Sequence, residues 1–234
     1  VVTFDDMTEF FKMQRVAAWS DVARRIAHEI KNPLTPIKLS AERIEKKIKD
    51  NDINKENFIS LAGTISKQVD DIGKLIDEFS SFARLPQAEI KKDDFSEAVN
   101  ECFKLYSSSY SKINFSIDHK YNEILCFFDK FQISLVLNNI TKNAIEAVEK
   151  LKNPSISFLV IKYDNMVNLD IIDNGIGIDK KLINKIFEPY YTTKEKGTGL
   201  GLSIVDKIIS DHNGSINFSN HKNGAKIQII IPKN

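Results

Sequence analysis

The sequence predicts an α+β chain in two parts, a helical hairpin followed by an α/β sandwich. Two observations predict this division. Between residues 16 and 83, apolar side chains recur at steps of three or four, which is the period of an amphipathic helix. Beyond residue 94, short apolar runs typical of strands alternate with helical stretches. Pro86 and the polar residues 87–94 separate the two parts and are typical of a linker.

The helical part contains two apolar rows, one on each side of a polar break at residues 50–56. The first row consists of Val16, Trp19, Ala23, Ile26, Ile30, Leu34, Ile37, Ala41, Ile44 and Ile48, and the second of Phe58, Leu61, Ile65, Val69, Ile72, Ile76, Phe79 and Ala83. Two long amphipathic helices with a short polar loop form an antiparallel hairpin. A single hairpin leaves much of its apolar surface uncovered. We therefore expect a homodimer in which two hairpins form a four-helix bundle.

In the second part, the pattern predicts strands at residues 113–117, 124–128, 155–162, 167–172, 215–219 and 226–231, and helices at residues 96–106, 130–150 and 200–212. Strands and helices that alternate in this way predict a sheet with one face covered by helices. Asp129 stands where the N-cap of the central helix is expected. Residues 180–196 are polar and weakly patterned, so we expect a mobile lid there.

Composition excludes several classes of protein. The net charge of +1 provides no basic field, so we expect no nucleic-acid partner. Cys102 and Cys126 fit no zinc or redox spacing, which indicates a reducing compartment. No apolar run approaches the roughly 20 residues of a membrane-spanning helix, and no signal peptide is visible, so we expect a cytoplasmic location. Residues 1–8 are typical of a strand end and a connector, and we expect the natural protein to extend upstream.

The first candidate for chemistry is His28, in the run HEIKNP. It lies two residues from both Ile26 and Ile30, so it is turned about 200° away from the apolar row, towards solvent. A neutral imidazole is a competent nucleophile near neutral pH, since its usual pKa is about 6.5. Glu29 follows directly and can accept the proton of the other ring nitrogen. Asn32 lies four residues on, over the same face, and can orient a water.

Pro33 removes a backbone donor one turn after His28, so we expect it to loosen or kink the helix. Taken alone, a histidine beside a glutamate on a helix is usually an ordinary surface residue. A second set of residues further along the chain favours the functional interpretation.

Those residues predict a nucleotide pocket. Asn139 and Asn143 are four residues apart and leave one face of the central helix, where neutral oxygens suit Mg²⁺. Asp173 ends an apolar strand, and its carboxylate can accept a hydrogen bond from the exocyclic amine of adenine. Gly175 and Gly177 follow, where backbone can approach a flat base closely.

A second glycine cluster, GTGLGL, leads into a helix whose first amides can hold phosphate oxygens. The residues that we expect to contact the nucleotide here are Lys194, Gly197, Thr198, Gly199, Leu200 and Gly201. This cluster is similar to a dinucleotide-binding fingerprint, but no strand stands just before it, which argues against that interpretation.

Together these motifs resemble the sensor histidine kinases of two-component systems. HEIKNP resembles their H-box, NNITKNA (138–144) the N-box and DNGIGI (173–178) the G1 box, while IFEPYYTTK (186–194) resembles the F-box and GTGLGL (197–202) the G2 box. The five runs occur in the family's order across nearly the whole chain. The longer run at residues 28–44 is most similar to the NtrY branch of nitrogen-regulation kinases, and residues 1–10 resemble the junction that follows a PAS sensor domain.

The resemblance implies three regions. Residues 1–8 would end an upstream PAS-like sensor domain, residues 9–86 would form a dimerisation and histidine phosphotransfer domain, and residues 87–234 would form a Bergerat-type ATP-binding domain. It implies ATP and Mg²⁺ as cofactors. The implied partner is the receiver domain of an NtrX-like response regulator. The full-length protein would be anchored in a membrane through regions outside this sequence.

It also implies roles for single residues. His28 would be the phosphoacceptor and Glu29 the general base, while Asn32 would act in dephosphorylation of the partner. Asn143 would bind Mg²⁺, and Asp173 would bind adenine. One departure is Glu146, where many family members carry a lysine.

We expect autophosphorylation of His28 and transfer to an aspartate of a response regulator, with phosphatase activity towards that regulator. Two alternatives stay open. An ATP-driven clamp of the gyrase or Hsp90 type would not need HEIKNP, and those ATPases carry a glutamate where Asn139 stands. A scaffold or regulated phosphatase would use the pocket only to sense nucleotide.

Overall fold

The computed structural model describes residues 8–52, 54–83, 87–119, 121, 123–179, 181–183, 185–189, 191–192, 194, 199–222 and 224–233. Within these ranges, side chains are described except at residues 8–26, 28, 74, 77–83 and 119. The chain divides into two compact units, Val1–Ser80 and Ser81–Asn234. Each unit is presented by itself.

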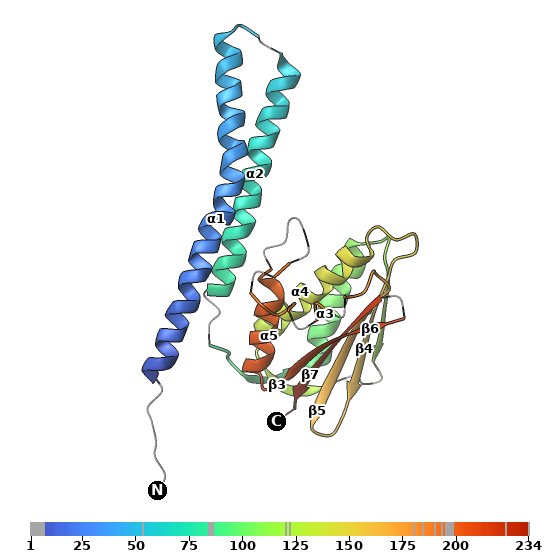
Figure 1. Cartoon of the computed structure of the whole chain (residues 1–234). Helices are drawn as coiled ribbons and strands as arrows, with labels where there is room; N and C mark the ends of the chain where they lie inside the picture. The colour runs from blue at the N-terminus through green and yellow to red at the C-terminus, as the bar shows by residue number, and fades with distance from the viewer. Residues whose placement is uncertain are drawn as a thin grey trace. The chain divides into compact units, whose positions relative to one another are not determined.

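The first unit is an antiparallel hairpin of two helices, α1 (Thr8–Lys49) and α2 (Lys55–Ala83) (Figure 1). α1 ends in a turn in which Asn51 adopts a left-handed backbone with φ of 55°. Asn54 then caps α2, because its Oδ1 accepts hydrogen bonds from the amides of Glu56 and Asn57 at 3.0 and 3.2 Å. Lys47 and Asp52 pair across the turn at 2.5 Å. The predicted hairpin is confirmed.

α1 runs through Pro33 and Pro36 without ending. Neither proline has an amide to donate, so each removes one hydrogen bond from the helix. The hydroxyl of Thr35 donates to the carbonyl oxygen of Lys31 at 3.3 Å within the same turn. Pro33 is buried. The packing of the hairpin thus holds a helix through a sequence that local preference would interrupt.

The predicted apolar rows separate into two sets. Ile30, Ile37 and Ile44 of α1 are half-buried along the contact with α2. Leu34 and Ile48, from the same predicted row, are exposed by 48% and 56%. The hairpin therefore buries only part of its apolar surface within one chain.

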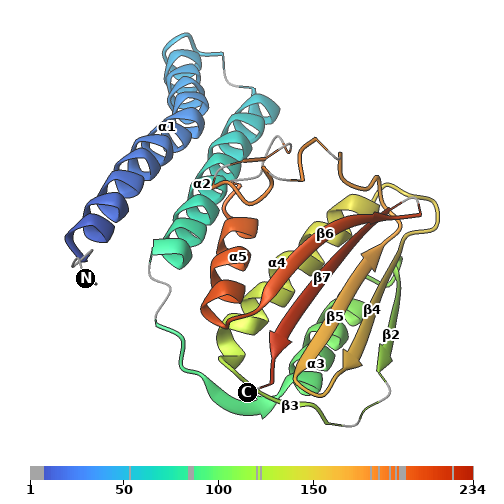
Figure 2. The same ribbon diagram turned by 60° about the horizontal axis from the view of Figure 1, so that its bottom comes forward.

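The second unit is an α/β sandwich, as the sequence predicts. Its helices are α3 (Phe95–Ser109), α4 (Lys130–Val148) and α5 (Gly201–Asp211), and its strands are β1 (Lys91–Asp94), β2 (Asn114–His119), β3 (Leu125–Phe128), β4 (Ser155–Lys162), β5 (Met166–Asp173), β6 (Ser215–His221) and β7 (Gly224–Pro232). Five strands form one sheet in the order β2-β4-β5-β7-β6. β2 pairs parallel to β4, and the other pairs are antiparallel. The helices cover one face of this sheet (Figure 2).

The core lies between that sheet face and the helices. In β4 and β7 alternate residues are buried, in accordance with the period of two of a strand, whereas β5 between them is buried on both faces from Val167 to Ile171. The fully buried side chains include Phe158, Leu169, Ile171 and Ile229 of the sheet, and Ile133, Leu137 and Ile140 of α4. α4 therefore lies directly over the strands whose ends carry the candidate site.

The predicted linker is wrong at its C-terminal end, which forms strand β1. Residues 91–94 (KKDD) were expected to connect the two parts, but they form a strand antiparallel to β3, with Lys91 opposite Phe128 and Asp94 opposite Leu125. Four charged residues carry no apolar signal, so only the backbone pairing defines this strand. Asp94 then caps α3, because its Oδ1 accepts from the amide of Ser96 at 2.9 Å.

Asp129 caps α4 as predicted, with its Oδ1 accepting from the amide of Gln132 at 3.0 Å. The amide of Asp129 donates to Nε2 of His212 at 2.9 Å, and Nδ1 of His212 lies 2.7 Å from the carbonyl oxygen of Ile208. His212 is buried, which agrees with the packing role expected for it. Its ring joins the end of α5 to the start of α4, the two helices that carry the candidate site.

Candidate functional site

The predicted site residues fall into two groups in different units. His28, Glu29 and Asn32 lie on α1 in the first unit. The side chain of His28 lies outside the described residues, whereas Glu29 is half-buried and Asn32 is exposed. The remaining predicted residues belong to the second unit, where the structure brings most of them together at one end of the sheet.

Asp173, the last residue of β5, is 4% exposed. Its Oδ1 accepts hydrogen bonds from the amides of Gly175 at 2.7 Å and Ala225 at 3.2 Å. Among the described residues, none donates a hydrogen bond to Oδ2, which is left to accept from a ligand. Burial raises the pKa of this carboxyl, and the two amide hydrogen bonds oppose that shift. One oxygen is thus anchored and the other is available.

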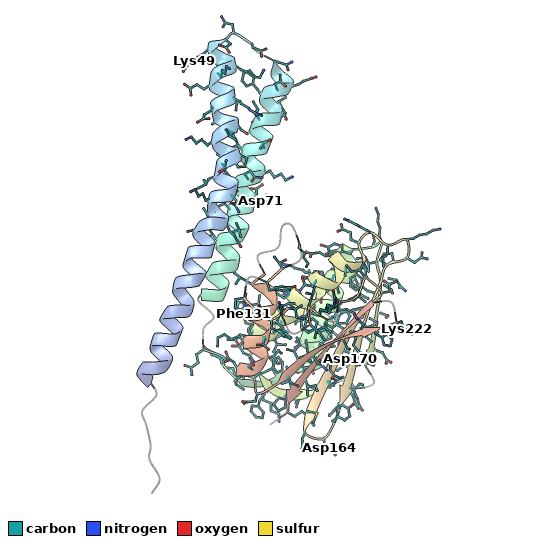
Figure 3. All side chains as sticks on the ribbon, in the orientation of Figure 1. Lys49, Asp71, Phe131, Asp164, Asp170 and Lys222 are labelled. Carbon is teal, nitrogen blue, oxygen red and sulfur yellow. The ribbon has the colours of Figure 1, made fainter. Side chains whose placement is uncertain are left out.

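Asp170, labelled in Figure 3, is a useful contrast on the same strand. It is equally buried, but Lys226 of β7 pairs with its Oδ2 at 2.6 Å. The amide groups of Asn168 and Gln228 donate to its Oδ1 at 3.0 and 3.3 Å. The charge of Asp170 is therefore balanced within the fold, whereas that of Asp173 is stabilised by backbone amides.

Two glycines allow backbone to pass close to Asp173. A methyl group on Gly175 would lie 2.8 Å from the Cβ and the carbonyl oxygen of Ala147 on α4. A methyl group on Gly224 would lie 1.9 Å from the carbonyl oxygen of Asp173. Sequence analysis identified Gly175 but missed Gly224. An Asn-Gly pair between two strands signals a turn, yet the contact with Asp173 depends on the pairing of β5 with β7.

The loop after Asp173 is fastened to β6. Gly177 has a φ of 70°, a conformation that favours glycine. Asn220 of β6 accepts from the amide of Ile178 and donates to its carbonyl oxygen, both at 2.7 Å. Sequence analysis did not find Asn220, since no local pattern links it to a loop 42 residues away. This reciprocal pair of hydrogen bonds fixes the loop after Asp173 to β6.

Asn139 and Asn143 project from α4, as predicted. Nδ2 of Asn139 donates to the carbonyl oxygen of Leu135 at 2.9 Å. Its Oδ1 lies so close to Gly201 that a methyl group there would be 2.8 Å away. Asn139 therefore lies in the contact between α4 and the start of α5.

Asn143 meets the lid segment. Its Oδ1 accepts a hydrogen bond from Nζ of Lys194 at 2.7 Å, and the same ammonium pairs with the carboxylate of Glu146. An amide oxygen on α4 thus already binds a cation in this structure, which is an observation that fits a site for Mg²⁺. No group of three or more His, Cys, Asp or Glu side chains that suits a metal occurs among the described residues.

α5 begins at Gly201, and the N-cap residue Leu200 provides no side-chain hydrogen bond to it. Gly199 has a φ of 68° and brings the chain into this helix. The first amides of a helix can bind the oxygens of a phosphate. Gly197 and Thr198, which were predicted to take part, lie outside the described residues.

Part of the predicted lid is anchored on the sheet. The ring of Phe187 packs edge-on against that of Phe218 of β6, with 5.2 Å between their centroids. Short turns occur among the described residues 181–183 and 185–189, for example from the amide of Lys185 to the carbonyl oxygen of Leu182 at 2.8 Å. The lid therefore begins from a fixed aromatic contact next to the pocket.

Comparison with known proteins identifies two domains on this chain. Residues 18–88 match the His Kinase A (phospho-acceptor) domain. Residues 128–234 match the family of histidine kinase-, DNA gyrase B- and HSP90-like ATPases. No helix in the described parts of the chain has the length and apolar character that a bilayer-spanning segment needs.

Among curated proteins, the chain is 43% identical over 230 residues to nitrogen regulation protein NtrY of Azorhizobium caulinodans, a match that covers 96% of this chain and 30% of that protein. It is 37% identical over 217 residues to an NtrY-like sensor histidine kinase of Rickettsia typhi, covering 92% of this chain and 36% of that protein. The chain thus spans about a third of the length of these relatives.

Solved structures of a histidine kinase are also similar to this chain. The histidine kinase ThkA in complex with response regulator protein TrrA matches with a TM-score of 0.79 and 28% identity, covering 99% of this chain and 69% of that chain. The catalytic domain of ThkA alone matches with a TM-score of 0.58 and 34% identity, covering 62% of this chain and 98% of that chain.

Proposed function

This chain belongs to the sensor histidine kinase family, and we propose that it transfers the γ-phosphoryl group of ATP to His28 and from there to an aspartate of a response regulator. The observation that carries the proposal is the pocket around Asp173. A buried carboxylate with one anchored oxygen lies beside close-packed glycines, and in the same unit the start of α5 lies against Asn139 of α4. That arrangement suits an adenine nucleotide.

In the proposed complex, Oδ2 of Asp173 accepts a hydrogen bond from the exocyclic amine of adenine. Gly175 and Gly177 let the base lie against backbone. The phosphates lie towards the start of α5, where amides of the run 197–201 donate to their oxygens. Asn143 would hold Mg²⁺, which would neutralise phosphate charge when bound with ATP. Lys194 adds a positive charge from the lid.

At His28, one ring nitrogen attacks the γ-phosphorus while the bond to the ADP oxygen breaks. Glu29 accepts the proton that the other ring nitrogen releases, so the phosphorylated imidazole stays neutral on its ring. Asn32, exposed one turn further along α1, then orients a water against the phosphorylated partner. The proposal therefore includes phosphatase activity towards the regulator.

The proposed partner is the receiver domain of an NtrX-like response regulator. Support comes from ThkA, whose match covers 99% of this chain. The solved structure of ThkA is a complex with the response regulator protein TrrA. Residues 9–86 would form the phosphotransfer domain and residues 87–234 the ATP-binding domain. Residues 1–8 would connect them to an upstream PAS-like sensor domain, and the full-length protein would be anchored in a membrane.

We also propose a homodimer, because two exposed apolar rows lie on one side of the hairpin. Leu34, Ala41 and Ile48 recur every seven residues on α1, and Ala62, Val69 and Ile76 do so on α2. On each helix the row stands four residues, about 40° in the same sense, from half-buried residues: Ile30, Ile37 and Ile44 on α1, and Phe58, Ile65 and Ile72 on α2. The helices are antiparallel, so equal rotations bring the two rows to the same face. A second hairpin packed there would complete a four-helix bundle.

The decisive experiment is labelling with γ-³²P-ATP. The unaltered chain should form an acid-labile, base-stable phosphoprotein, and His28→Gln should form none while its ADP affinity stays unchanged. Retained acid-labile labelling of His28→Gln would remove His28 as the acceptor. Steady ATP hydrolysis without any phosphoprotein would favour an ATP-driven clamp instead.

A further inference from the structure

Side chains from α4 and from the lid converge on a single point in the second unit. Asn143 and Glu146 are three residues apart, so both project from one side of α4. Nζ of Lys194 lies 2.7 Å from Oδ1 of Asn143 and also binds Oε2 of Glu146. The side chains of Glu146 and Lys194 are 54% and 45% exposed, so the point is open to solvent and to a ligand.

Oδ1 of Asn143 and Oε2 of Glu146 bind the same ammonium and so form a small cation site. An amide oxygen and a carboxylate oxygen are hard ligands of the kind that Mg²⁺ and Mn²⁺ prefer. Mg²⁺ in proteins is commonly held by one or two side-chain oxygens, with phosphate oxygens and waters in the remaining positions. The pair on α4 has this composition.

We propose that Glu146 is a second protein ligand, beside Asn143, for the divalent cation that accompanies the nucleotide, and that Lys194 occupies this site when the cation is absent. The inference rests on the proposed nucleotide pocket and adds a metal ligand and an exchange of cations to it. In this structure the ammonium of Lys194 takes the place that the divalent cation would occupy.

Charge explains why the two cations would exclude one another. With Lys194 in place, its positive charge balances the negative charge of Glu146, and Asn143 is neutral. A divalent cation on the same oxygens would repel the ammonium at short range. Lys194 would then leave α4 and become available to phosphate oxygens.

The test separates a ligand from a residue that only positions Lys194. Mn²⁺ is titrated into the ADP-saturated chain, and free Mn²⁺ is followed by electron paramagnetic resonance. Glu146→Gln should weaken Mn²⁺ binding by about tenfold or more, because a carboxylate charge in contact with the ion is lost. Lys194→Met should strengthen it, because the competing cation is gone. Glu149→Gln, which removes an exposed carboxylate at the end of α4, is the matched control and should change nothing.

The double variant Glu146→Gln/Lys194→Met decides the matter. A metal ligand still matters when Lys194 is absent, so the double variant should bind Mn²⁺ at least about tenfold more weakly than Lys194→Met alone. Equal Mn²⁺ affinities in those two proteins would overturn the proposal and leave Glu146 as a partner of Lys194 only. ADP binding is measured in parallel, both in EDTA and with Mn²⁺, and a correct pocket requires binding under at least one of these conditions. If the unaltered chain fails to bind ADP, the nucleotide pocket itself is wrong, and this inference falls with it.

Discussion

At the scale of single residues, Asp173 is the feature on which the pocket depends. Its partners are the amides of Gly175 and Ala225, and burial raises the pKa of its carboxyl despite them. Asp170 is also a buried carboxylate, but Lys226 balances its charge within the sheet. A buried carboxylate that is held by amide dipoles leaves room for a ligand to supply the missing donor.

Asp173→Asn should change the preference for the base rather than the fold. The asparagine carbonyl can still accept from the two amides, but its NH₂ group then opposes the exocyclic amine of adenine. Hydrogen bonds to charged groups contribute about 1.5–3 kcal/mol, so ADP affinity should fall by about 10- to 100-fold. IDP carries a carbonyl in place of that amine and should bind the variant at least as well as ADP does. Calorimetric titration of both proteins with both nucleotides measures this, and equal ADP affinities would refute the assignment.

The raised pKa of Asp173 also predicts a pH dependence. Its protonation starts at a higher pH than that of an exposed aspartate, so ADP affinity should fall as pH is lowered, and the fall should begin above the pH at which an exposed aspartate is protonated. The effect on stability has the opposite sign. The folded pKa lies above the unfolded one, so this group stabilises the fold relatively at low pH, and that contribution is lost as pH rises through the folded pKa. Asp173→Asn should show neither dependence, and a pH-dependent ADP affinity in that variant would point to another group.

The sequence identified Asp173 because a carboxylate that ends an apolar strand before two glycines is a local pattern. It could not identify Asn220 or Gly224. Asn220 binds Ile178, and Gly224 lies against the carbonyl of Asp173, only because β7 and β6 follow β5 in the sheet. No local sequence pattern gives the strand order, so residues whose contacts depend on that order cannot be identified from the sequence.

At the scale of elements, local periodicity predicted most of the helices and strands, because their apolar residues face one core. β1 escaped prediction, since its residues KKDD contribute backbone rather than side chains to the pairing with β3. α1 departs from local preference in the other direction, as it continues through Pro33 and Pro36. In both cases tertiary pairing outweighs the preference of the residues themselves.

The start of β7 offers a test of how tightly these elements close around the pocket. A methyl group on Gly224 would lie 1.9 Å from the oxygen and 2.6 Å from the carbon of the Asp173 carbonyl, so β7 must shift. Gly224→Ala should lower the free energy of unfolding of the second unit by about 1–3 kcal/mol, the range for overpacked sites, and should weaken ADP binding. Urea unfolding followed by circular dichroism, with ADP titrations alongside, measures both.

Gly63→Ala is the matched control, because an added methyl on this residue of α2 meets no atom within 4 Å. It should leave ADP binding unchanged and raise the stability of the hairpin by up to about 1 kcal/mol, since alanine favours a helix over glycine. If Gly224→Ala proved as stable as the unaltered chain, the close approach of β7 to Asp173 would be wrong.

At the scale of the whole molecule, the proposed reaction joins groups from two units. His28 belongs to the hairpin and the nucleotide pocket to the sandwich. The sequence predicted a linker through residue 94, but β1 begins at Lys91, so the segment between α2 and the first strand is shorter than expected. In the proposed reaction, ATP bound by the second unit has to reach His28 of the hairpin.

Assembly is the remaining property of the whole molecule, and the apolar row of α2 makes it testable. Val69 is 53% exposed on the row that faces the proposed second hairpin. In a dimer its side chain would be buried, and an unpaired carboxylate there would cost several kcal/mol, so Val69→Glu should raise the dimer dissociation constant by about 100-fold or more. Ile59 is 62% exposed but lies roughly 80° around α2 from that row, so Ile59→Glu introduces the same charge outside the interface and should leave the dimer intact. Sedimentation equilibrium on both variants distinguishes the two faces. Equal dissociation of the two variants, or a Val69→Glu chain that stays dimeric, would show that this row is not the surface through which two copies meet.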